Sequence, residues 1–176
     1  MPEQPQPLVG VVMGSKSDLE WGQQVSRYLQ ELGIPHESRI LSAHRTPVEA
    51  AHYAQSAAER GLAVIIAIAG LAAHLPGVLA AYTWLPVIGL PLAGGPLRGQ
   101  DALYAMVQMP PGVPVATVGL DNPRNAAVLA AQILAVRHSD VRARLLQWRR
   151  EQTESVRLAD RQLQQSSATA VPEPRP

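Results

Sequence analysis

The chain contains no cysteine, and this absence excludes several classes of site at once. Without thiols there can be no disulfide bond, thiolate nucleophile, iron–sulfur cluster or zinc finger. The five histidines, at positions 36, 44, 52, 74 and 138, form neither an HExxH motif nor an i, i+4 pair, so we expect no metal site. The phosphate-binding patterns GxxxxGKS/T and GxGxxG are also missing, which argues against ATP and dinucleotides.

Charged residues are scarce, at 16% of the chain against about 25% in an average globular protein. Burial of surface between subunits would explain this shortage. Fifteen basic and 14 acidic residues give a net charge of +1, and the Arg149-Arg150 pair is the largest basic block. We therefore expect neither nucleic acid nor an anionic membrane as a partner.

Long hydrophobic runs are absent too. The longest, residues 62–73, is too short for a bilayer, which needs about 20 apolar residues. The opening residues MPEQPQP lack the basic and apolar segments of a signal peptide, so we expect a cytoplasmic protein. A chain of 176 residues corresponds to one domain. We assign residues 1–7 to a flexible lead-in, 8–165 to the domain and 166–176 to a disordered tail.

Short apolar runs alternate with segments of helical periodicity along the domain. The predicted strands are 8–13, 37–41, 62–69, 86–92 and 113–120. The predicted helices are 17–32, 46–61, a segment from 74–77 through 82, 101–109, 122–136 and 139–165. Ser17 and Glu20 have capping-box spacing, and Thr46 with Pro47 predicts the next helix start.

Strands that alternate with helices and are apolar throughout predict an α/β protein with a five-stranded parallel sheet covered on both faces. Ligands bind such sheets beyond the carboxyl ends of the strands. The last helix, 139–165, has no place left on a five-stranded sheet and carries much of the late charge. We expect it to pack on a neighbouring subunit.

Polar side chains follow three of the predicted strands at these ends. They are Ser15, Ser17 and Asp18 after the first strand, Ser42, His44 and Arg45 after the second, and His74 after the third. The GSKSD segment is either a simple turn with a helix cap or a phosphate site made of backbone amides and hydroxyls. Asp18 would repel a bare phosphate, whereas it could accept hydrogen bonds from ribose hydroxyls. The loop therefore suggests a sugar phosphate.

The histidines also allow two interpretations. His44 carries an imidazole, the side chain that most often serves as an acid or base near neutral pH, and it stands beside Arg45. Arg45 is a cation that could bind phosphate, although it could equally be a surface charge. His74 could be a hydrogen-bonded core residue or part of the site. Their places at neighbouring strand ends favour a shared crevice.

At these residues the sequence resembles the N5-carboxyaminoimidazole ribonucleotide mutases of purine biosynthesis, also called the catalytic subunit of phosphoribosylaminoimidazole carboxylase. The resemblance is collinear over about residues 8–150. The segments that carry it are VVMGSKSD, LSAHRTP, AAHLPG, LPVIGLPL, VQMPPGVPVATV and NAAVLAAQIL.

The resemblance implies a three-layer, flavodoxin-like sandwich assembled as a homo-octamer, with a C-terminal helix that reaches a neighbour. It implies movement of a carboxyl group from the exocyclic nitrogen of the substrate to ring carbon 4, giving 4-carboxy-5-aminoimidazole ribonucleotide. This isomerase needs no metal, biotin or nucleotide cofactor. A preceding N5-carboxyaminoimidazole ribonucleotide synthetase would hand over the substrate.

The resemblance also implies a role for each site residue. Ser15 would line the end of the pocket that holds the carboxylate, and Asp18 would bind the ribose. The phosphate would be held by Ser17, Ser42 and Arg45. His44 would act as acid and base. Gly70 and His74 would belong to the wall of the carbon dioxide pocket. The histidine of AHLPG favours the mutase class over the direct carboxylases, which join carbon dioxide to aminoimidazole ribonucleotide.

Three departures from the family pattern stand near this wall. Ile68 and Leu71 replace expected glycines, and the loop 119–124 (GLDNPR) is shorter and poorer in glycine. Each could narrow the pocket. Leu71 would require a changed loop conformation or would enter the cavity; our hypothesis is that it points away and that activity survives.

Two other functions are alternatives to the mutase. The direct carboxylase would differ in the substrate that turns over. A non-catalytic flavodoxin-like or receiver-like binding module would use a sheet of the same order. A receiver needs a phosphorylatable aspartate after the third strand, where this chain has Ala69, Gly70 and Leu71.

Overall fold

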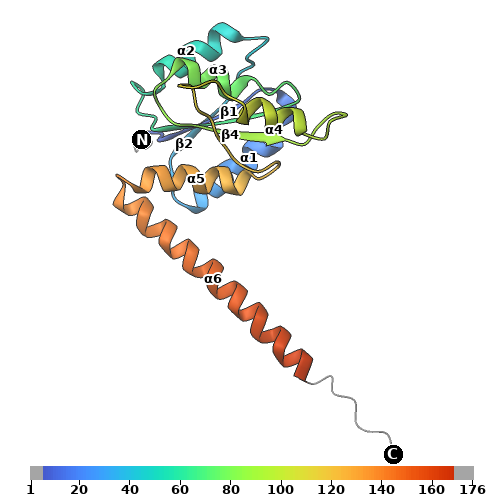
Figure 1. Cartoon of the computed structure of the whole chain (residues 1–176). Helices are drawn as coiled ribbons and strands as arrows, with labels where there is room; N and C mark the ends of the chain where they lie inside the picture. The colour runs from blue at the N-terminus through green and yellow to red at the C-terminus, as the bar shows by residue number, and fades with distance from the viewer. Residues whose placement is uncertain (1–5, 169–176) are drawn as a thin grey trace, which may run out of the picture.

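The computed structural model describes residues 6–168 of the chain, and side chains to residue 166. It contains a three-layer α/β sandwich from which one long helix projects (Figure 1). The strands are β1 Val9–Met13, β2 His36–Ile40, β3 Val64–Gly70, β4 Val87–Leu92 and β5 Ala116–Thr117. The α-helices are α1 Leu19–Glu31, α2 Pro47–Ala57, α3 Leu75–Tyr82, α4 Gln100–Val107, α5 Pro123–Ala135 and α6 Ser139–Ala168, and a 3-10 helix, η1, covers Lys16–Asp18.

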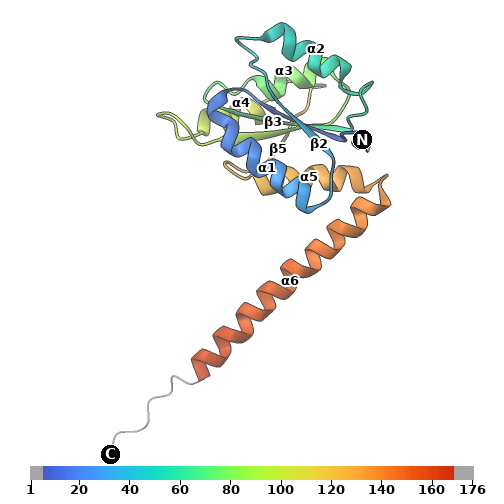
Figure 2. The same ribbon diagram turned by 180° about the vertical axis from the view of Figure 1, so that it is seen from behind.

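All strand pairs are parallel, and the spatial order is β2-β1-β3-β4-β5. This is the flavodoxin-like order, so the prediction of a five-stranded parallel sheet is confirmed. Helices α2, α3 and α4 cover one face, and α1 and α5 cover the other, as the two opposite views show (Figures 1 and 2). The order in which successive strands are added to the sheet reverses between β1 and β3, and this architecture binds its ligands at that point.

The central strand β3 divides its side chains between two cores, because successive residues of a strand point to opposite faces. Val64, Ile66 and Ile68 are buried with α1 and α5. Ile65, Ala67 and Ala69 belong to the core beneath α2, α3 and α4. Both faces are therefore apolar, as the continuous hydrophobic run predicted.

Two strands differ from their predictions. The edge strand β2 has the sequence HESRI and is largely exposed, so the expectation that every strand is apolar is wrong there. An edge strand needs only one protected side, and charges on it discourage pairing with other chains. Strand β5 covers two residues rather than 113–120. Prolines at 110, 111 and 114 cannot donate to a ladder, which confines pairing to the segment after them.

Two helix ends also differ from prediction. The Ser17 capping box is wrong, since α1 begins at Leu19 after η1 and the Ser17 hydroxyl donates to Asp18 instead. Helix α2 begins at Pro47, as predicted, but ends at Ala57 rather than at Gly61. At the end of α1, Gly33 has φ +63° and its N–H donates to the Gln30 carbonyl, a helix-terminating role that glycine performs without strain.

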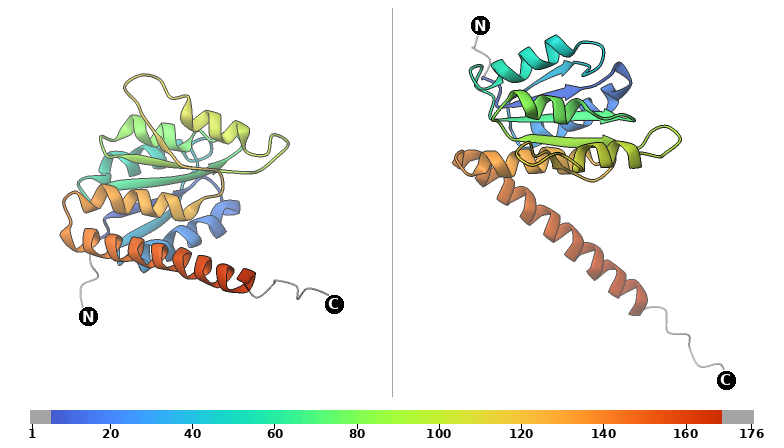
Figure 3. Two further views of the ribbon diagram at one scale, coloured as in Figure 1. Left: turned by 60° about the horizontal axis from the view of Figure 1, so that its bottom comes forward. Right: turned by 45° about the horizontal axis from the view of Figure 1, so that its top comes forward.

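Helix α6 is anchored only by its first turns. Val141 and Leu145 are buried in the core that α5 shares, and Arg144 donates to the carbonyls of Leu32 and Gly33. The helix then leaves the body of the molecule (Figure 3). It continues to Ala168, beyond the predicted end at 165, so residues 166–168 of the predicted tail are helical. Residues 1–5 and 169–176 lie outside the described part.

Candidate active site

A pocket of about 740 Å³ opens at the carboxyl ends of four strands. Its walls come from four loops, one after each of β1, β2, β3 and β4, and from the first turns of α1 and α3. The lining residues are Gly14, Ser15, Ser17, Asp18, Trp21, Ser42, Ala43, His44, Arg45, Ala69, Gly70, Leu71, Ala72, Leu75, Leu92, Ala93, Gly94 and Gly95. The predicted convergence of three loops on one crevice is confirmed, and a fourth loop joins them.

The loop after β1 places a buried carboxylate in the pocket. Asp18 is 7% exposed, and its Oδ1 accepts a hydrogen bond from the Ser17 hydroxyl at 2.9 Å. Burial raises the pKa of Asp18, and the hydrogen bonds from Ser17 and Ser15 together with the charge of Arg45 offset part of this rise. The carboxylate is thus short of solvation and favours hydroxyl donors from a ligand.

The loop after β2 is held in place by hydrogen bonds between its own residues. The Ser42 N–H donates to Thr46 Oγ1 at 2.8 Å, and the Arg45 N–H donates to Ser42 Oγ at 3.1 Å. The Arg45 guanidinium reaches the Gly14 carbonyl at 3.4 Å, which places its charge against the loop after β1. None of the ion pairs among residues 6–166 includes Arg45, so its charge is available to an anion.

His44 and His74 form a pair at the mouth of the pocket. The Nε2 atom of His44 lies 2.9 Å from Nδ1 of His74, and the rings meet edge to face with centroids 5.0 Å apart. A hydrogen bond between two ring nitrogens needs a proton on one of them and a lone pair on the other, so the two tautomers are linked. His74 does not line the pocket itself, so the expectation that it forms part of the pocket wall is not met; its ring contacts the lining residue His44.

The three departures from the family pattern have different places. Ile68 is fully buried against α1 and α5 and does not line the pocket. The loop 119–124 lies behind the site, where the Asp121 N–H donates to the Pro91 carbonyl and the Asp121 Oδ1 accepts from the Ala93 N–H at 2.9 Å. Neither therefore narrows the pocket directly.

Leu71 is the departure that does reach the pocket. It has φ +55°, the left-handed conformation that glycine adopts more easily, so the loop keeps a glycine-like backbone with a leucine on it. The side chain is 52% exposed and lines the cavity. The hypothesis that Leu71 points away from the pocket is therefore wrong.

Sequence reasoning also missed part of the site. Trp21 lines the pocket, whereas its spacing in the sequence indicates only that it belongs to the first helix. The backbone of Ala93, Gly94 and Gly95 forms one rim, and the Gly94-Gly95 pair after a predicted strand was the available signal for it.

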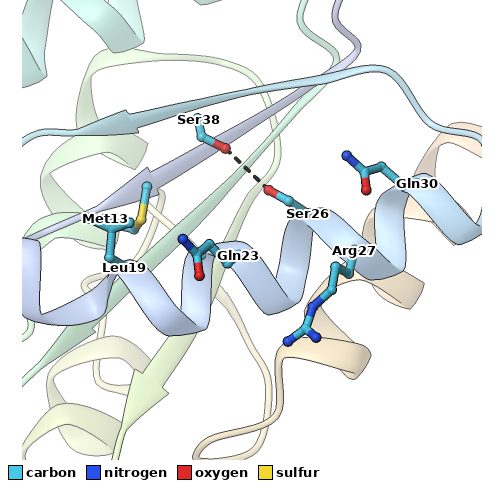
Figure 4. Close-up of a pocket in the computed structure, with 8 residues that line it drawn as sticks. Met13, Leu19, Gln23, Ser26, Arg27, Gln30 and Ser38 are labelled. Carbon is cyan, nitrogen blue, oxygen red and sulfur yellow. Dashed lines mark hydrogen bonds between the residues drawn. The ribbon is translucent and has the colours of Figure 1, made fainter.

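A second hollow of about 490 Å³ lies between α1 and β2 (Figure 4). Four of its eight lining residues carry a side-chain amide or hydroxyl, and a hydrogen bond of 3.3 Å joins two of them, Ser26 and Ser38. Arg27 is its sole ionisable side chain, and it lies to the side of β2 rather than at the strand ends. It therefore offers no acid–base pair for catalysis.

No group of three or more histidine, aspartate or glutamate side chains suited to a metal ion occurs within residues 6–166. No helix in the described part of the chain is both long and apolar enough to cross a bilayer.

The family model described as "AIR carboxylase" matches residues 8–155. The chain belongs to the AIR carboxylase family. An N5-carboxyaminoimidazole ribonucleotide mutase from Pyrococcus horikoshii is 50% identical over 150 residues, which are 85% of each chain. A phosphoribosylaminoimidazole carboxylase from Schizosaccharomyces pombe is 56% identical over 129 residues, which are 73% of this chain and 23% of that protein. Among solved structures of the family, Treponema denticola PurE superposes with a TM-score of 0.82 at 28% identity, covering 89% of this chain and 98% of that one.

Proposed function

We propose that this member of the AIR carboxylase family is an N5-carboxyaminoimidazole ribonucleotide mutase of purine biosynthesis. The observation that carries the proposal is one pocket lined by two chemically different sets of residues. Arg45 and several hydroxyls make up a polar part that is available to an anion, and His44, whose ring contacts His74, lines the same pocket as small apolar residues. The 50% identity to proteins of that name supports the same conclusion.

The polar end suits a ribose phosphate. The phosphate would be bound by the side chains of Arg45, Ser17 and Ser42. The backbone amides at the start of η1 would help, because N–H groups at a helix start point toward an anion. The Asp18 carboxylate would accept hydrogen bonds from the ribose hydroxyls. Ligand hydroxyls would then supply the solvation that burial removes from Asp18, which favours sugar binding over binding of a bare phosphate.

The other end suits the transfer of a carboxyl group. Breaking the carbamate N–C bond releases carbon dioxide, and the exocyclic nitrogen takes up one proton. Ring carbon 4 then attacks carbon dioxide and loses its own proton, so the overall isomerisation consumes no proton. A single acid–base group that gives a proton and later receives one completes this cycle, and His44 is the pocket residue able to do so.

His74 would make His44 suitable for this role. The 2.9 Å bond fixes the orientation of the His44 ring and links its protonation to the His74 tautomer. Gly70, together with Ala72 and Leu75, would form a wall without polar side chains against which carbon dioxide can rest, and Ser15 would contact the carboxylate as it forms.

A direct carboxylase is the second candidate, because the S. pombe relative carries that name and is 56% identical in the matched region. It would use the same pocket, but carbon dioxide would come from solution and aminoimidazole ribonucleotide would be the substrate. The two activities share the carbon–carbon bond-forming step, so the substrate distinguishes them.

We further propose that the protein works as a homo-octamer that receives its unstable carbamate from an N5-carboxyaminoimidazole ribonucleotide synthetase. The exposed apolar side chains on the later part of α6 support assembly. Val156 is 71% exposed there and Leu163 is 65% exposed. They lie seven residues apart and so share one face of the helix.

Proton NMR of the reaction tests the proposed activity. Purified protein is mixed with freshly formed carbamate, and the signal of the proton on ring carbon 4 is followed. The mutase predicts loss of this signal at a rate proportional to enzyme concentration. Conversion of the carbamate only to aminoimidazole ribonucleotide, with the carbon 4 proton intact, would contradict it.

A further inference from the structure

Trp21 is the largest side chain that lines the candidate pocket, and the proposed mechanism gives it no task. It lies in the first turn of α1, which follows η1 directly, and stands three residues after Asp18 and four after Ser17. Residues three and four apart on a helical turn are neighbours. The indole therefore lies beside the polar part of the pocket, next to the carboxylate proposed to bind the ribose.

The core of the protein supports the indole ring. Trp21 is partly buried and packs against the hydrophobic cluster that α1 shares with α5. Its ring N–H donates to no acceptor among residues 6–166 and is not a buried polar atom, so packing rather than hydrogen bonding positions the ring. An aromatic surface backed by the core thus forms part of the pocket wall.

A carboxylate next to an aromatic ring suits a sugar. A ribose carries hydroxyls at its edge and C–H groups on the faces of its ring, so the Asp18 carboxylate can accept from the hydroxyls while the indole packs against the C–H groups. The phosphate does not suit the same surface, because the face of an aromatic ring carries partial negative charge. Of the parts of a ribonucleotide, the sugar is the one that matches both neighbours.

We propose that Trp21 is a substrate-binding residue whose indole packs against the ribose and makes the pocket prefer a ribose phosphate to other phosphate monoesters. This inference rests on the proposed function, because it takes the substrate to be a ribonucleotide. Arg45 and the hydroxyls can bind a phosphate whatever carries it, and Asp18 can accept from any vicinal diol. Trp21 adds a contact that requires a ring with an apolar face.

The test compares two phosphate esters that differ chiefly in the sugar ring. Ribose 5-phosphate and glycerol 3-phosphate both carry a phosphate monoester and vicinal hydroxyls, but only the first forms a ring. Their affinities for the full chain are measured by calorimetry for wild type, Trp21→Leu and Trp21→Phe. Leucine keeps apolar volume against the core, and phenylalanine keeps an aromatic face. Trp84→Leu is the matched control, since Trp84 is 83% exposed and does not line the pocket.

Wild type, Trp21→Phe and Trp84→Leu are expected to bind ribose 5-phosphate more tightly than glycerol 3-phosphate. Trp21→Leu should bind ribose 5-phosphate about 3- to 10-fold more weakly than wild type does, and glycerol 3-phosphate within about twofold of wild type. Equal losses for both esters in Trp21→Leu, or an unchanged affinity for ribose 5-phosphate, would overturn the ribose contact. The same loss in Trp84→Leu would also overturn it.

Turnover of the carbamate by wild type is followed in parallel, so that the two proposals can fail separately. If wild type forms product while Trp21→Leu binds both esters normally, the mutase stands and only the role of Trp21 falls. A wild type that forms no product and binds neither ester would remove the proposed function and this inference together.

Tryptophan fluorescence gives a second readout that does not require Trp21→Leu to fold. Ribose 5-phosphate should change the emission of wild type and of Trp84→Leu, because the sugar would contact the Trp21 indole. The change should disappear in Trp21→Phe, which retains Trp84 and Trp148. An emission change that persists in Trp21→Phe, or no change in wild type saturated with ribose 5-phosphate, would overturn the contact.

Discussion

The Nε2 atom of His44 and the Nδ1 atom of His74 lie 2.9 Å apart, although the residues are separated by a strand and a helix in the chain. This hydrogen bond leaves Nδ1 of His44 free to contact a ligand, and only one proton can lie between Nε2 of His44 and Nδ1 of His74. In the proposed mechanism the pair would act as one acid–base unit, and this role would distinguish a catalytic pocket from a sugar phosphate site that only binds.

Replacement of His44 by asparagine should abolish turnover and preserve substrate binding. Positioned proton transfer contributes about 10²–10⁴-fold to rates, so kcat should fall at least about 100-fold. Binding of aminoimidazole ribonucleotide, measured by calorimetry, should change little because Arg45 and Asp18 remain. His52→Asn is the matched control, since His52 is exposed on α2 away from the pocket. Near-normal kcat in His44→Asn would remove this residue from the mechanism.

Asp18→Asn should stabilise the unliganded protein at neutral pH and weaken substrate binding. The pKa of Asp18 is raised in the folded state, so its contribution to stability is full below pH 3.8 and is lost as pH rises through the folded pKa. The gain from asparagine in urea unfolding should therefore shrink toward acidic pH. For substrate binding, loss of the charged acceptor of the ribose hydroxyls should cost about 1.5–3 kcal/mol of binding free energy, which corresponds to an affinity about 10- to 100-fold lower.

Asp140→Asn provides the control of opposite sign for this pH dependence. The hydrogen bond from Arg144 lowers the pKa of Asp140, so its contribution is present above pH 3.8 and is lost as pH falls through the folded pKa. This variant should lose stability at neutral pH and not gain it. A stability gain in both variants at neutral pH would show that burial of Asp18 is not the cause.

Ile68 should respond to substitution as a core residue, although it replaces an expected glycine. Ile68→Val should cost about 0.5–1.5 kcal/mol of unfolding free energy because it removes a buried methylene group, and KM should stay within about twofold of wild type. A marked change in KM at unaltered stability would place Ile68 in the site after all.

Gly95→Ala should destabilise the protein through two causes, a left-handed backbone and overlap with the Leu71 side chain. We expect a loss of about 1 kcal/mol or more in urea unfolding. The double variant Leu71→Gly with Gly95→Ala removes the overlap, so the two effects should not add, with a coupling of at least about 0.5 kcal/mol. Additive effects would show that the two residues do not touch in solution.

Deletion of residues 151–176 should separate the subunits without unfolding the body. The anchoring residues Val141, Leu145 and Trp148 remain, whereas the exposed apolar face of α6 is lost. Light scattering should report a mass well below that of wild type, and the far-ultraviolet circular dichroism should lose only the helical signal of the deleted turns of α6. Deletion of only 169–176 is the control. An octamer that survives the longer deletion would contradict assembly through α6.

The arrangement of the strands and the place of the site could be predicted from the sequence because parallel buried strands are continuous apolar runs, and their carboxyl ends meet at one edge. Ser15, Asp18, Ser42, His44 and Arg45 line the pocket as expected for this reason. Strand β5 was harder to delimit, since valines near Pro114 have high strand propensity while the prolines prevent pairing.

Contacts between loops could not be predicted in the same way. Helical spacing shows that Trp21 is on the inner face of α1 but not that this face ends at the pocket. The approach of Leu71 to Gly95 and the direction of the Ser17 hydroxyl depend on loop dihedral angles, which no periodic pattern encodes.

One measurement tests the mutase activity most directly. Purified protein is given two substrates in parallel: freshly formed carbamate, and aminoimidazole ribonucleotide with bicarbonate kept too low to regenerate the carbamate. Formation of 4-carboxy-5-aminoimidazole ribonucleotide is then followed. Product from the carbamate alone is the result predicted here, whereas product from aminoimidazole ribonucleotide and dissolved carbon dioxide without the carbamate would contradict it and identify a direct carboxylase.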